Sequence, residues 1–299
     1  MSALEIRGIR KSYGSVETLK GIDIALQSGE FLVLLGSSGC GKSTLLNIIA
    51  GLAEATSGDV LIGGRSILGV HPKNRDIAMV FQSYALYPNL TVRRNIGFGL
   101  EMRGVATDER DRAVNEAARL LQIEALLDRK PSQLSGGQRQ RISIARALAA
   151  EPEFLVCDEP TSALDVSVQA QILNLLKDLQ RELGLTYLFI SHNLAAVRHV
   201  SDRVAVMYLG RIVEEAATDE IFERPQHPYT RFLLDTVPNL DRPNRDRVPA
   251  TVDLPSPIDP PPGCAYNPRC PLATDTCRTD APESRPVGGT LVRCHHATL

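Results

Sequence analysis

One stretch of this chain restricts its fold more than any other. Residues 36–43 read GSSGCGKS and fit the pattern G-x-x-x-x-G-K-[ST]. An apolar run, FLVLL, precedes them and a predicted helix begins at Lys42, which is the context that validates the pattern. Backbone N–H groups in such a turn, together with the helix N-terminus, can surround phosphate oxygens. The residues expected to line this phosphate-binding loop are Gly36, Ser37, Ser38, Gly39, Cys40, Gly41, Lys42, Ser43 and Thr44.

A second apolar run ends in two acidic residues that fit the same chemistry. The segment FLVCDE predicts a buried strand with Asp158 at its carboxyl end, where open α/β sheets bind ligands. Lys42 is expected to reach the β- and γ-phosphates of a nucleotide, and the hydroxyl of Ser43 to ligate Mg²⁺. Asp158 is then expected to hold Mg²⁺ through water, and Glu159 to polarise an attacking water as general base. The alternative is an acidic surface turn after a strand.

The rest of the pattern alternates predicted strands with predicted helices, which indicates a mostly parallel α/β sheet. Residues 107–127 predict a helix with Thr107 as its N-cap. Residues 165–183 predict another helix, and residues 202–216 a β-hairpin. The expected buried face of the second helix consists of Val168, Ile172, Leu175, Leu179 and Leu183.

Five more short motifs occur in a fixed order along the chain. They are KSYG, VFQSY, LSGGQ, SALD and ISHN. Together with GSSGCGKST and FLVCDEP they resemble the ATP-binding subunits of ATP-binding cassette (ABC) transporters, over most of residues 1–235. The resemblance implies an ATPase that binds ATP and Mg²⁺, with a P-loop NTPase fold of the ABC type.

The resemblance also implies roles for single residues. Tyr13 of KSYG would stack on adenine, and Gln82 of VFQSY would reach Mg²⁺ and the attacking water. His192 of ISHN would contact the γ-phosphate, so that the catalytic group is Glu159, His192 and Gln82. Asp165 belongs to the SALD loop, which lies beside the nucleotide in the family.

The LSGGQ motif is a second glycine-rich segment in front of a predicted helix. By the resemblance, it serves the ATP held on the P-loop of a second subunit. The group that would face that γ-phosphate is Ser135, Gly136, Gly137 and Gln138. Two such half-sites would form a two-fold interface that encloses two ATP molecules.

The expected domain organisation follows from the family and from a change of composition. Residues 1–235 would form the nucleotide-binding domain, with a RecA-like core, a small antiparallel β subdomain and a helical subdomain at about residues 84–152. Prolines concentrate after residue 236, so residues 236–299 are expected to form a separate Pro- and Cys-rich extension.

Composition argues for a cytoplasmic chain that does not cross a membrane. No apolar run approaches the roughly 20 residues that a spanning helix needs, and the first residues lack the apolar core of a signal peptide. The resemblance to transporter subunits then implies a location on the cytoplasmic face of the membrane, with peripheral attachment through a partner. A net charge of −2 gives no reason to expect a nucleic-acid partner.

The resemblance implies the partners of such an importer ATPase. They are two integral-membrane permease subunits, a second ATPase subunit that is the same or a homologous chain, and an extracytoplasmic solute-binding protein. Residues 83–96, here called the docking segment, are expected to receive a short helix of the permease. Its apolar side chains Tyr84, Leu86 and Tyr87 would form the contact, although packing inside the helical subdomain is an alternative.

The transported solute is less clearly indicated, because two parts of the chain resemble different importers. Residues up to about 105 look like ATPases of sugar importers, and the chain from about residue 132 looks like those of oligopeptide, dipeptide and nickel importers. Peptide import is the preferred interpretation and sugar import the alternative. Two other classes remain: a soluble ABC ATPase acting on nucleic acid or ribosomes, and a module that binds ATP without turnover. Intact Glu159 and His192 argue against the last.

Four cysteines lie in the last part of the chain, at Cys264, Cys270, Cys277 and Cys294. Their spacing resembles the tail of the peptide-importer ATPases, in several of which four cysteines hold an iron–sulfur cluster. Four thiolates suit a [4Fe–4S] cluster or zinc, and His295 and His296 could replace thiolates on zinc. The alternative is four free or partly oxidised thiols.

Overall fold

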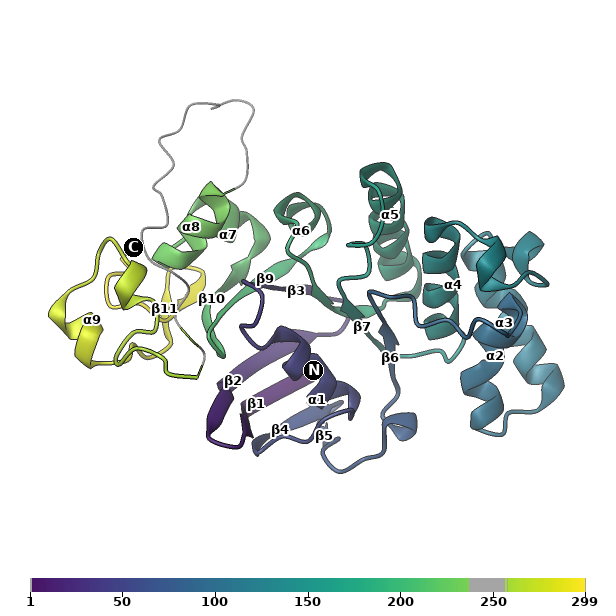
Figure 1. Cartoon of the computed structure of the whole chain (residues 1–299), viewed down its shortest axis with the longest axis horizontal. Helices are drawn as coiled ribbons and strands as arrows, with labels where there is room; N and C mark the ends of the chain where they lie inside the picture. The colour runs from purple at the N-terminus through teal and green to yellow at the C-terminus, as the bar shows by residue number, and fades with distance from the viewer. Residues whose placement is uncertain (1, 237–255, 257, 299) are drawn as a thin grey trace.

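The fold is organised around one large mixed β-sheet (Figure 1). The computed structural model describes residues 2–236, 256 and 258–298. The strands that these residues contribute to the large sheet are, in spatial order, β11 (Arg285–Val287), β12 (Thr290–Val292), β10 (Arg211–Ala217), β9 (Arg203–Tyr208), β3 (Phe31–Leu35), β8 (Thr186–Ile190), β7 (Phe154–Asp158) and β6 (Ile77–Val80). The pairs from β9 to β6 are parallel, and β10, β12 and β11 continue the sheet in antiparallel pairs.

A smaller sheet is antiparallel throughout, as predicted for the β subdomain. Its strands are β2 (Val16–Gln27), β1 (Ser2–Tyr13), β4 (Ser57–Ile62) and β5 (Arg65–Ser66), in that spatial order. The pairing of β1 with β2 contains several register shifts, which bend and twist the two long strands. This sheet lies below the large one in Figure 1, with the helix that follows β3 between them.

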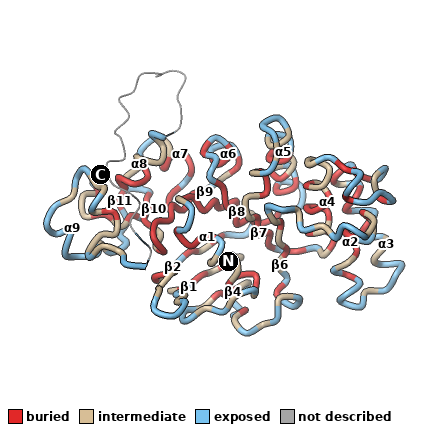
Figure 2. The backbone as a smooth tube through the Cα atoms, viewed as in Figure 1, coloured by how far each residue is buried: buried red, intermediate tan, exposed pale blue. Residues whose placement is uncertain are grey.

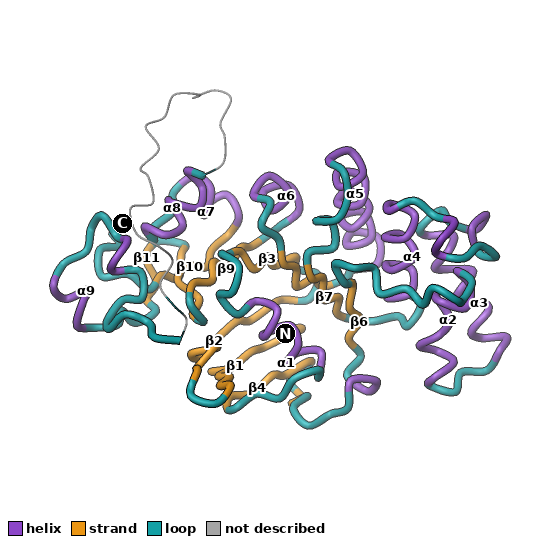
Figure 3. The backbone as a smooth tube through the Cα atoms, viewed as in Figure 1, coloured by secondary structure: helices purple, strands orange, loops and turns teal. Residues whose placement is uncertain are grey.

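Helices occupy both faces of the large sheet and one end of the molecule (Figure 3). In the described residues they are α1 (Lys42–Ala50), α2 (Val92–Met102), α3 (Thr107–Leu120), α4 (Gly136–Leu148), α5 (Val166–Leu183), α6 (Leu194–Val200), α7 (Thr218–Glu223), α8 (Pro228–Asp235) and α9 (Asp275–Thr279). Helices α2, α3 and α4 gather at the end of the sheet next to β6, within the region predicted as the helical subdomain.

The central strands of the large sheet are buried on both faces, which is the usual environment of parallel strands. All five residues of β3 and all five of β8 are buried. Alternate residues of β3 belong to two different apolar clusters: Phe31 packs toward α5 and α6, and Leu32 toward α1 and the small sheet. Figure 2 shows this buried layer running through the middle of the molecule. The sheet therefore holds the carboxyl ends of its strands in fixed positions.

Two details of the predicted helices are wrong. Thr107 is the first residue of α3 and not its N-cap; Ala106 takes the cap position and makes no side-chain cap bond, and the helix ends at Leu120. The predicted buried face of α5 is confirmed at Ile172 and Leu179, and Val168 and Leu175 pack partly against the core. Leu183 is wrong, because it is 46% exposed, and the face also includes two leucines that were not predicted, Leu173 and Leu176. The apolar residues of α5 are spread widely enough around it that packing, not periodicity, selected the face.

The described part of the C-terminal extension is joined to the core. Strand β12 pairs with β10, so that a hairpin of the extension forms the edge of the large sheet. The other described part of this region, including α9, lies beside that edge in Figure 1. The predicted domain boundary at residue 236 adjoins residues 237–255, which lie outside the described residues.

The docking segment is held in place by one side chain that sequence reasoning did not single out. Asn95 is fully buried at the start of α2. Its Oδ1 accepts a hydrogen bond from the backbone N–H of Tyr87 at 2.8 Å, and its Nδ2 donates to the carbonyl groups of Tyr87, Leu90 and Thr91 at 3.0–3.2 Å. One amide thus satisfies most of the inward-facing polar groups of a tight turn.

Replacing Asn95 by Ala should therefore destabilise the protein. The substitution removes the partner of the Tyr87 N–H and of the Leu90 carbonyl, whereas the carbonyls of Tyr87 and Thr91 each keep a bond from a backbone N–H. The loss costs about 2–3 kcal/mol and lowers the melting temperature by about 5 °C. Asn115→Ala is a matched control, because Asn115 is exposed on α3. Scanning calorimetry on both variants checks this, and equal melting temperatures would refute the role of Asn95.

Candidate functional site

The phosphate-binding loop connects β3 to α1, as the sequence pattern predicts. Within it, the ammonium group of Lys42 donates hydrogen bonds to the carbonyl oxygens of Gly36 at 2.8 Å and Ser37 at 2.9 Å, and lies 3.6 Å from the sulfur of Cys40. The lysine thus folds over its own loop and brings a positive charge to the loop's centre. Ser38, Gly39 and Ser43 are exposed on the open side of the loop, and Thr44 is partly exposed.

Two glycines of the loop are required by close contacts. A Cβ atom on Gly36 would lie 2.3 Å from the carbonyl oxygen of Met207 in β9, which no side chain could tolerate. Gly41 has φ 109°, and a Cβ atom there would meet the side chain of Leu19 at 2.8 Å. The loop is therefore pressed against β9 and β2, with its backbone in a shape that only glycine permits.

Asp158 stands where the sequence predicts it, at the last position of β7. Burial raises the pKa of its carboxyl group, the neighbouring Glu159 raises it further, and Lys42 opposes the shift. The carboxylate of Asp158 and the ammonium of Lys42 therefore act on each other across the site. The oxygen donors of Asp158 and Ser43 fit the hard ligand set that Mg²⁺ prefers.

The two principal catalytic candidates are in contact. The Nδ1 atom of His192 lies 3.2 Å from a carboxylate oxygen of Glu159. Glu159 has φ 45°, an uncommon backbone conformation for a residue other than glycine. Its N–H donates to the carbonyl of Ile190, and its carbonyl accepts from the hydroxyl of Ser162. These bonds hold a strained backbone that turns the carboxylate toward His192.

The remaining residues predicted around the nucleotide lie on the surface. Tyr13 is 53% exposed, with the ammonium of Lys11 at 4.8 Å from its ring centre. Gln82 is exposed in the loop that follows β6. Asp165 is the N-cap of α5, and its pKa is lowered by hydrogen bonds from the N–H of Val168 and the hydroxyl of Ser167. Its visible role is therefore structural.

The LSGGQ motif forms the beginning of α4. Ser135 is the N-cap, and its hydroxyl accepts from the N–H of Gln138 at 3.3 Å, while the side chain of Gln138 accepts from the N–H of Ser135 at 3.0 Å. This is a capping box, which leaves the first amides of α4, at Gly136 and Gly137, without intrahelical partners. An added Cβ on Gly136 would lie 3.2 Å from the hydroxyl of Tyr84, so the motif adjoins the docking segment.

Arg146 connects α4 to the docking segment. No sequence motif predicts these contacts. Its guanidinium group donates to the carbonyl oxygens of Tyr84, at 3.1 Å, and of Ala85. Both of these residues have positive φ, at 60° and 48°. The helix that begins with LSGGQ therefore holds the docking segment in an uncommon backbone conformation. Of the predicted contact residues, Tyr87 is 43% exposed, whereas Leu86 packs partly into the core.

The four tail cysteines lie near one another without forming a metal site. No three His, Cys, Asp or Glu side chains in the described residues are placed to hold a metal ion, so the predicted iron–sulfur or zinc cluster is not supported. The pKa of Cys264 is raised to about 11, chiefly by burial and to a smaller extent by the other three thiols, while a backbone hydrogen bond from Tyr266 opposes the shift. High pKa values favour the thiol over the metal-binding thiolate. The side chains predicted as substitute ligands have other partners: His295 Nε2 lies 2.9 Å from the carbonyl of Asp280, and His296 Nε2 lies 3.3 Å from the sulfur of Cys277.

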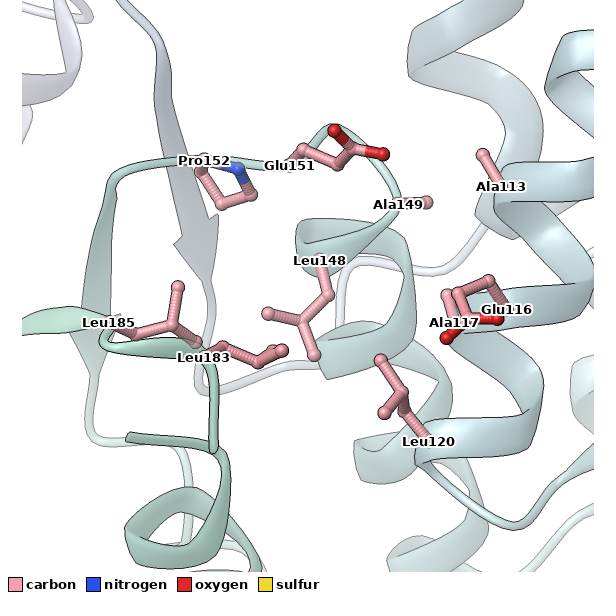
Figure 4. Close-up of a pocket in the computed structure, with 10 residues that line it drawn as sticks. All are labelled: Ala113, Glu116, Ala117, Leu120, Leu148, Ala149, Glu151, Pro152, Leu183 and Leu185. Carbon is pink, nitrogen blue, oxygen red and sulfur yellow. The ribbon is translucent and has the colours of Figure 1, made fainter. Parts of the chain in front are cut away.

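A pocket of about 330 Å³ lies elsewhere, between α3, the end of α4 and the end of α5 (Figure 4). Its lining is largely apolar, with side chains such as Leu120, Leu148 and Leu185 pointing into it, and Glu116 and Glu151 at the edge. None of the predicted site residues lines this pocket. The predicted nucleotide-binding loop lies instead at the carboxyl end of β3, with Ser38, Gly39 and Ser43 exposed.

Across the described ranges, no helix is both long enough and apolar enough to pass through a bilayer.

Comparisons with known proteins identify the family of the chain. Residues 19–162 match the family model described as ABC transporter, and residues 213–277 match the one described as oligopeptide/dipeptide transporter, C-terminal region. The di/tripeptide transport ATP-binding protein DppF of Pseudomonas aeruginosa is 44% identical, with 97% of this chain and 93% of that protein covered. The probable peptide ABC transporter ATP-binding protein y4tS of Sinorhizobium fredii is 46% identical, with 94% and 82% covered.

Solved structures of ATP-binding cassettes resemble about three quarters of the chain. The ATP-binding cassette MJ0796, in a dimeric post-hydrolysis state with ADP and Pi, is 33% identical with a TM-score of 0.65, covering 72% of this chain and 98% of that one. The protein cbiO1 of Clostridium perfringens, part of the transporter complex cbiONQ, is 32% identical with a TM-score of 0.69, covering 75% and 92%. The predicted P-loop NTPase fold of ABC type, with its RecA-like core, is thereby confirmed.

The relatives also bear on the predicted division of the chain. Because the peptide-transport relatives align with nearly all of it, the comparisons do not support a sugar-importer resemblance for the first 105 or so residues. Similarity of this extent, together with a P-loop, paired carboxylates and an LSGGQ helix in the expected places, shows that the protein belongs to the ATP-binding proteins of the ABC transporter family.

Proposed function

We propose that this chain is the ATP-hydrolysing subunit of an ABC importer of peptides and works with a separate membrane permease. The observation that carries the enzymatic part is the contact of Glu159 with His192, at 3.2 Å. Glu159 follows Asp158, a carboxyl group whose pKa burial raises and the charge of Lys42 lowers. The peptide assignment is supported by relatives that are 42–46% identical and are named for peptide transport. It is also supported by the match of residues 213–277.

Each side chain has a distinct task in hydrolysis. Lys42 leaves its bonds to the loop carbonyls and neutralises the β- and γ-phosphates, while the loop amides and the N-terminus of α1 bind their oxygens. Glu159 polarises the attacking water as general base, and His192 contacts the γ-phosphate from the adjoining strand end. Mg²⁺, when bound through Ser43, Gln82 and Asp158, supplies charge neutralisation for the phosphates. Tyr13 offers an exposed ring for the adenine to stack on.

The helix that begins at LSGGQ completes the site of a second subunit. The exposed N-terminus of α4, with Ser135 as its cap, presents free amides and a partial positive charge suited to a γ-phosphate. The ATP on the P-loop of the same chain takes no part in this contact. In a two-fold dimer each ATP is then bound by the P-loop of one subunit and the LSGGQ segment of the other. Hydrolysis removes the phosphate that joins them, and the dimer opens.

The proposed function also implies the partners and the location of the protein. Two permease subunits, a second ATPase subunit and an extracytoplasmic solute-binding protein complete the importer, and the chain sits peripherally on the cytoplasmic face of the membrane. The docking segment receives the permease, and its coupling to α4 through Arg146 links the permease to the LSGGQ end of the dimer interface. The functional division is residues 1–235 for ATP hydrolysis, with a helical subdomain at about 84–152, and residues 236–299 as an extension.

Removing the general base should trap the enzyme with ATP. Glu159→Gln keeps the size of the side chain but not its basicity, so the hydrolysis rate should fall by roughly 10²–10⁴-fold while ATP binding persists. Phosphate release and size-exclusion chromatography with ATP would measure both effects. The matched control is Glu182→Gln, an exposed acid near the end of α5. A rate near that of the unmodified protein would show that Glu159 is not the base.

Removing the P-loop ammonium should weaken nucleotide binding. Lys42→Ala deletes the charge expected on the phosphates, and charge-assisted hydrogen bonds of this kind contribute enough to raise the ATP dissociation constant at least about tenfold. Titration calorimetry gives the value directly. Lys73→Ala, at an exposed lysine outside the site, should leave it unchanged. Unaltered affinity in Lys42→Ala would contradict the assignment of the loop.

A mixed dimer tests whether the LSGGQ segment acts across subunits. Ser135→Arg blocks that segment in one chain, and Lys42→Ala disables the P-loop in the other. Each variant alone should show little ATP-dependent dimerisation, but their mixture contains one composite site free of both changes and should recover up to half of it. The unmodified chain, assayed in parallel, sets the scale. If the unmodified chain dimerises with ATP and the mixture does not, the cross-subunit geometry is wrong.

A further inference from the structure

One amide of the phosphate-binding loop points into the protein. The N–H of Ser37 donates a hydrogen bond to the phenolic oxygen of Tyr229, at 2.9 Å. Tyr229 belongs to α8, is only 1% exposed and lies far along the chain from the loop. This N–H is therefore satisfied by the fold and is not among the amides free to bind phosphate. The phenol acts as a fixed point for the first turn of the loop.

The position of Tyr229 is itself closely determined. The carboxylate of Glu214, on β10, accepts from the N–H groups of Gln226 at 2.6 Å and His227 at 2.9 Å. The Nδ1 atom of His227 then accepts from the N–H of Tyr229 at 3.0 Å. Burial lowers the pKa of His227 to about 4, so the ring is neutral at physiological pH and Nδ1 keeps the lone pair that this bond needs. The start of α8 is thus attached to the large sheet at the strand that pairs with the extension.

The extension closes over the other side of the tyrosine. Tyr266 is 3% exposed, and its ring lies 5.5 Å from that of Tyr229 and 5.3 Å, edge-on, from that of Tyr208. The rings of Tyr208 and Tyr229 are 4.5 Å apart. Such tilted pairs add to the stability of a cluster beyond the apolar area they bury. The three rings form what we call the tyrosine cluster, in which the extension supplies one member.

Tyr266 is joined to the cysteine region by short connections. It lies between Cys264 and Cys270 in the chain, and the N–H of Cys264 donates to the carbonyl of Cys277 at 2.8 Å. A small pocket between the extension and the core is lined by Tyr208, His227, Cys264 and Tyr266. A change in the packing of the extension can therefore displace Tyr266. The contact of its ring with that of Tyr229 transmits the change to the phenol that binds the N–H of Ser37.

We propose that Tyr229 is a positioning residue for the phosphate-binding loop, and that the extension sets the ATP affinity of the loop by fixing Tyr229 through Tyr266. The inference rests on the proposed ATP site. The path is continuous: Tyr266 contacts Tyr229, whose hydroxyl holds Ser37, which belongs to the loop that Lys42 completes. A role in core packing alone would explain the contacts between the tyrosine rings. It would not explain the hydrogen bond that the hydroxyl of Tyr229 accepts from the N–H of Ser37.

The first experiment removes only the hydroxyl group. Tyr229→Phe keeps the ring in the tyrosine cluster and deletes the acceptor of the Ser37 N–H, so the KM for ATP should rise about fivefold with kcat changed less than twofold. The control is Tyr187→Phe, because Tyr187 is buried in β8 and its hydroxyl has no hydrogen-bond partner. An unchanged KM in Tyr229→Phe, or an equal rise in Tyr187→Phe, would overturn the proposal.

The second experiment tests the link to the extension. Tyr266→Leu retains apolar bulk but removes the ring, and should raise the ATP dissociation constant about two- to fivefold. The same substitution in a Tyr229→Phe background should add little, because both changes act through one hydrogen bond. Additive effects, or no effect of Tyr266→Leu alone, would refute the relay. If the unmodified chain failed to bind ATP at all, the proposed function would fall instead, so the two failures are distinguishable.

Discussion

The whole arrangement depends on one buried strand, β3, that ends in the phosphate-binding loop. Strand β3 is enclosed on both faces, so it can deliver the turn that follows it only to one place at the edge of the sheet. Gly36 and Gly41 let that turn press against β9 and β2. Because the neighbouring strands β7 and β8 run parallel to β3, their own carboxyl ends bring Asp158, Glu159 and His192 to the same edge. The sheet and the proposed catalytic residues therefore depend on the same feature, the parallel strands that end at one edge.

Around this edge, the protein uses backbone strain only where other groups compensate for it. Glu159 has a positive φ, and its N–H and carbonyl both have partners. Tyr84 and Ala85 also have positive φ, and Arg146 binds their two carbonyl groups. Uncommon backbone conformations persist when surrounding contacts determine them. Among the positions with such a backbone are the proposed general base, Glu159, and the segment expected to meet the permease.

The C-terminal extension is continuous with the core in its described residues. Strand β12 extends the large sheet, and Tyr266 enters the tyrosine cluster next to the phosphate-binding loop. The spacing of the cysteines predicts a metal site by its resemblance to the family pattern, but among the residues that the structure describes these side chains form no metal-binding group. In the structure, this region packs Tyr266 against Tyr229.

The sequence by itself determined the fold class, the P-loop, the acidic strand end and the order of the motifs, because each depends on residues adjacent in the chain and on local periodicity. It could not determine which leucines of α5 are buried, where α3 begins, or that Asn95 and Arg146 support the docking segment. Those features depend on groups that are distant in the chain and meet only after packing. The contact of Tyr229 with Ser37 is of the same kind: a hydrogen bond across the fold has no signature in the order of residues, and only the tertiary structure decided it.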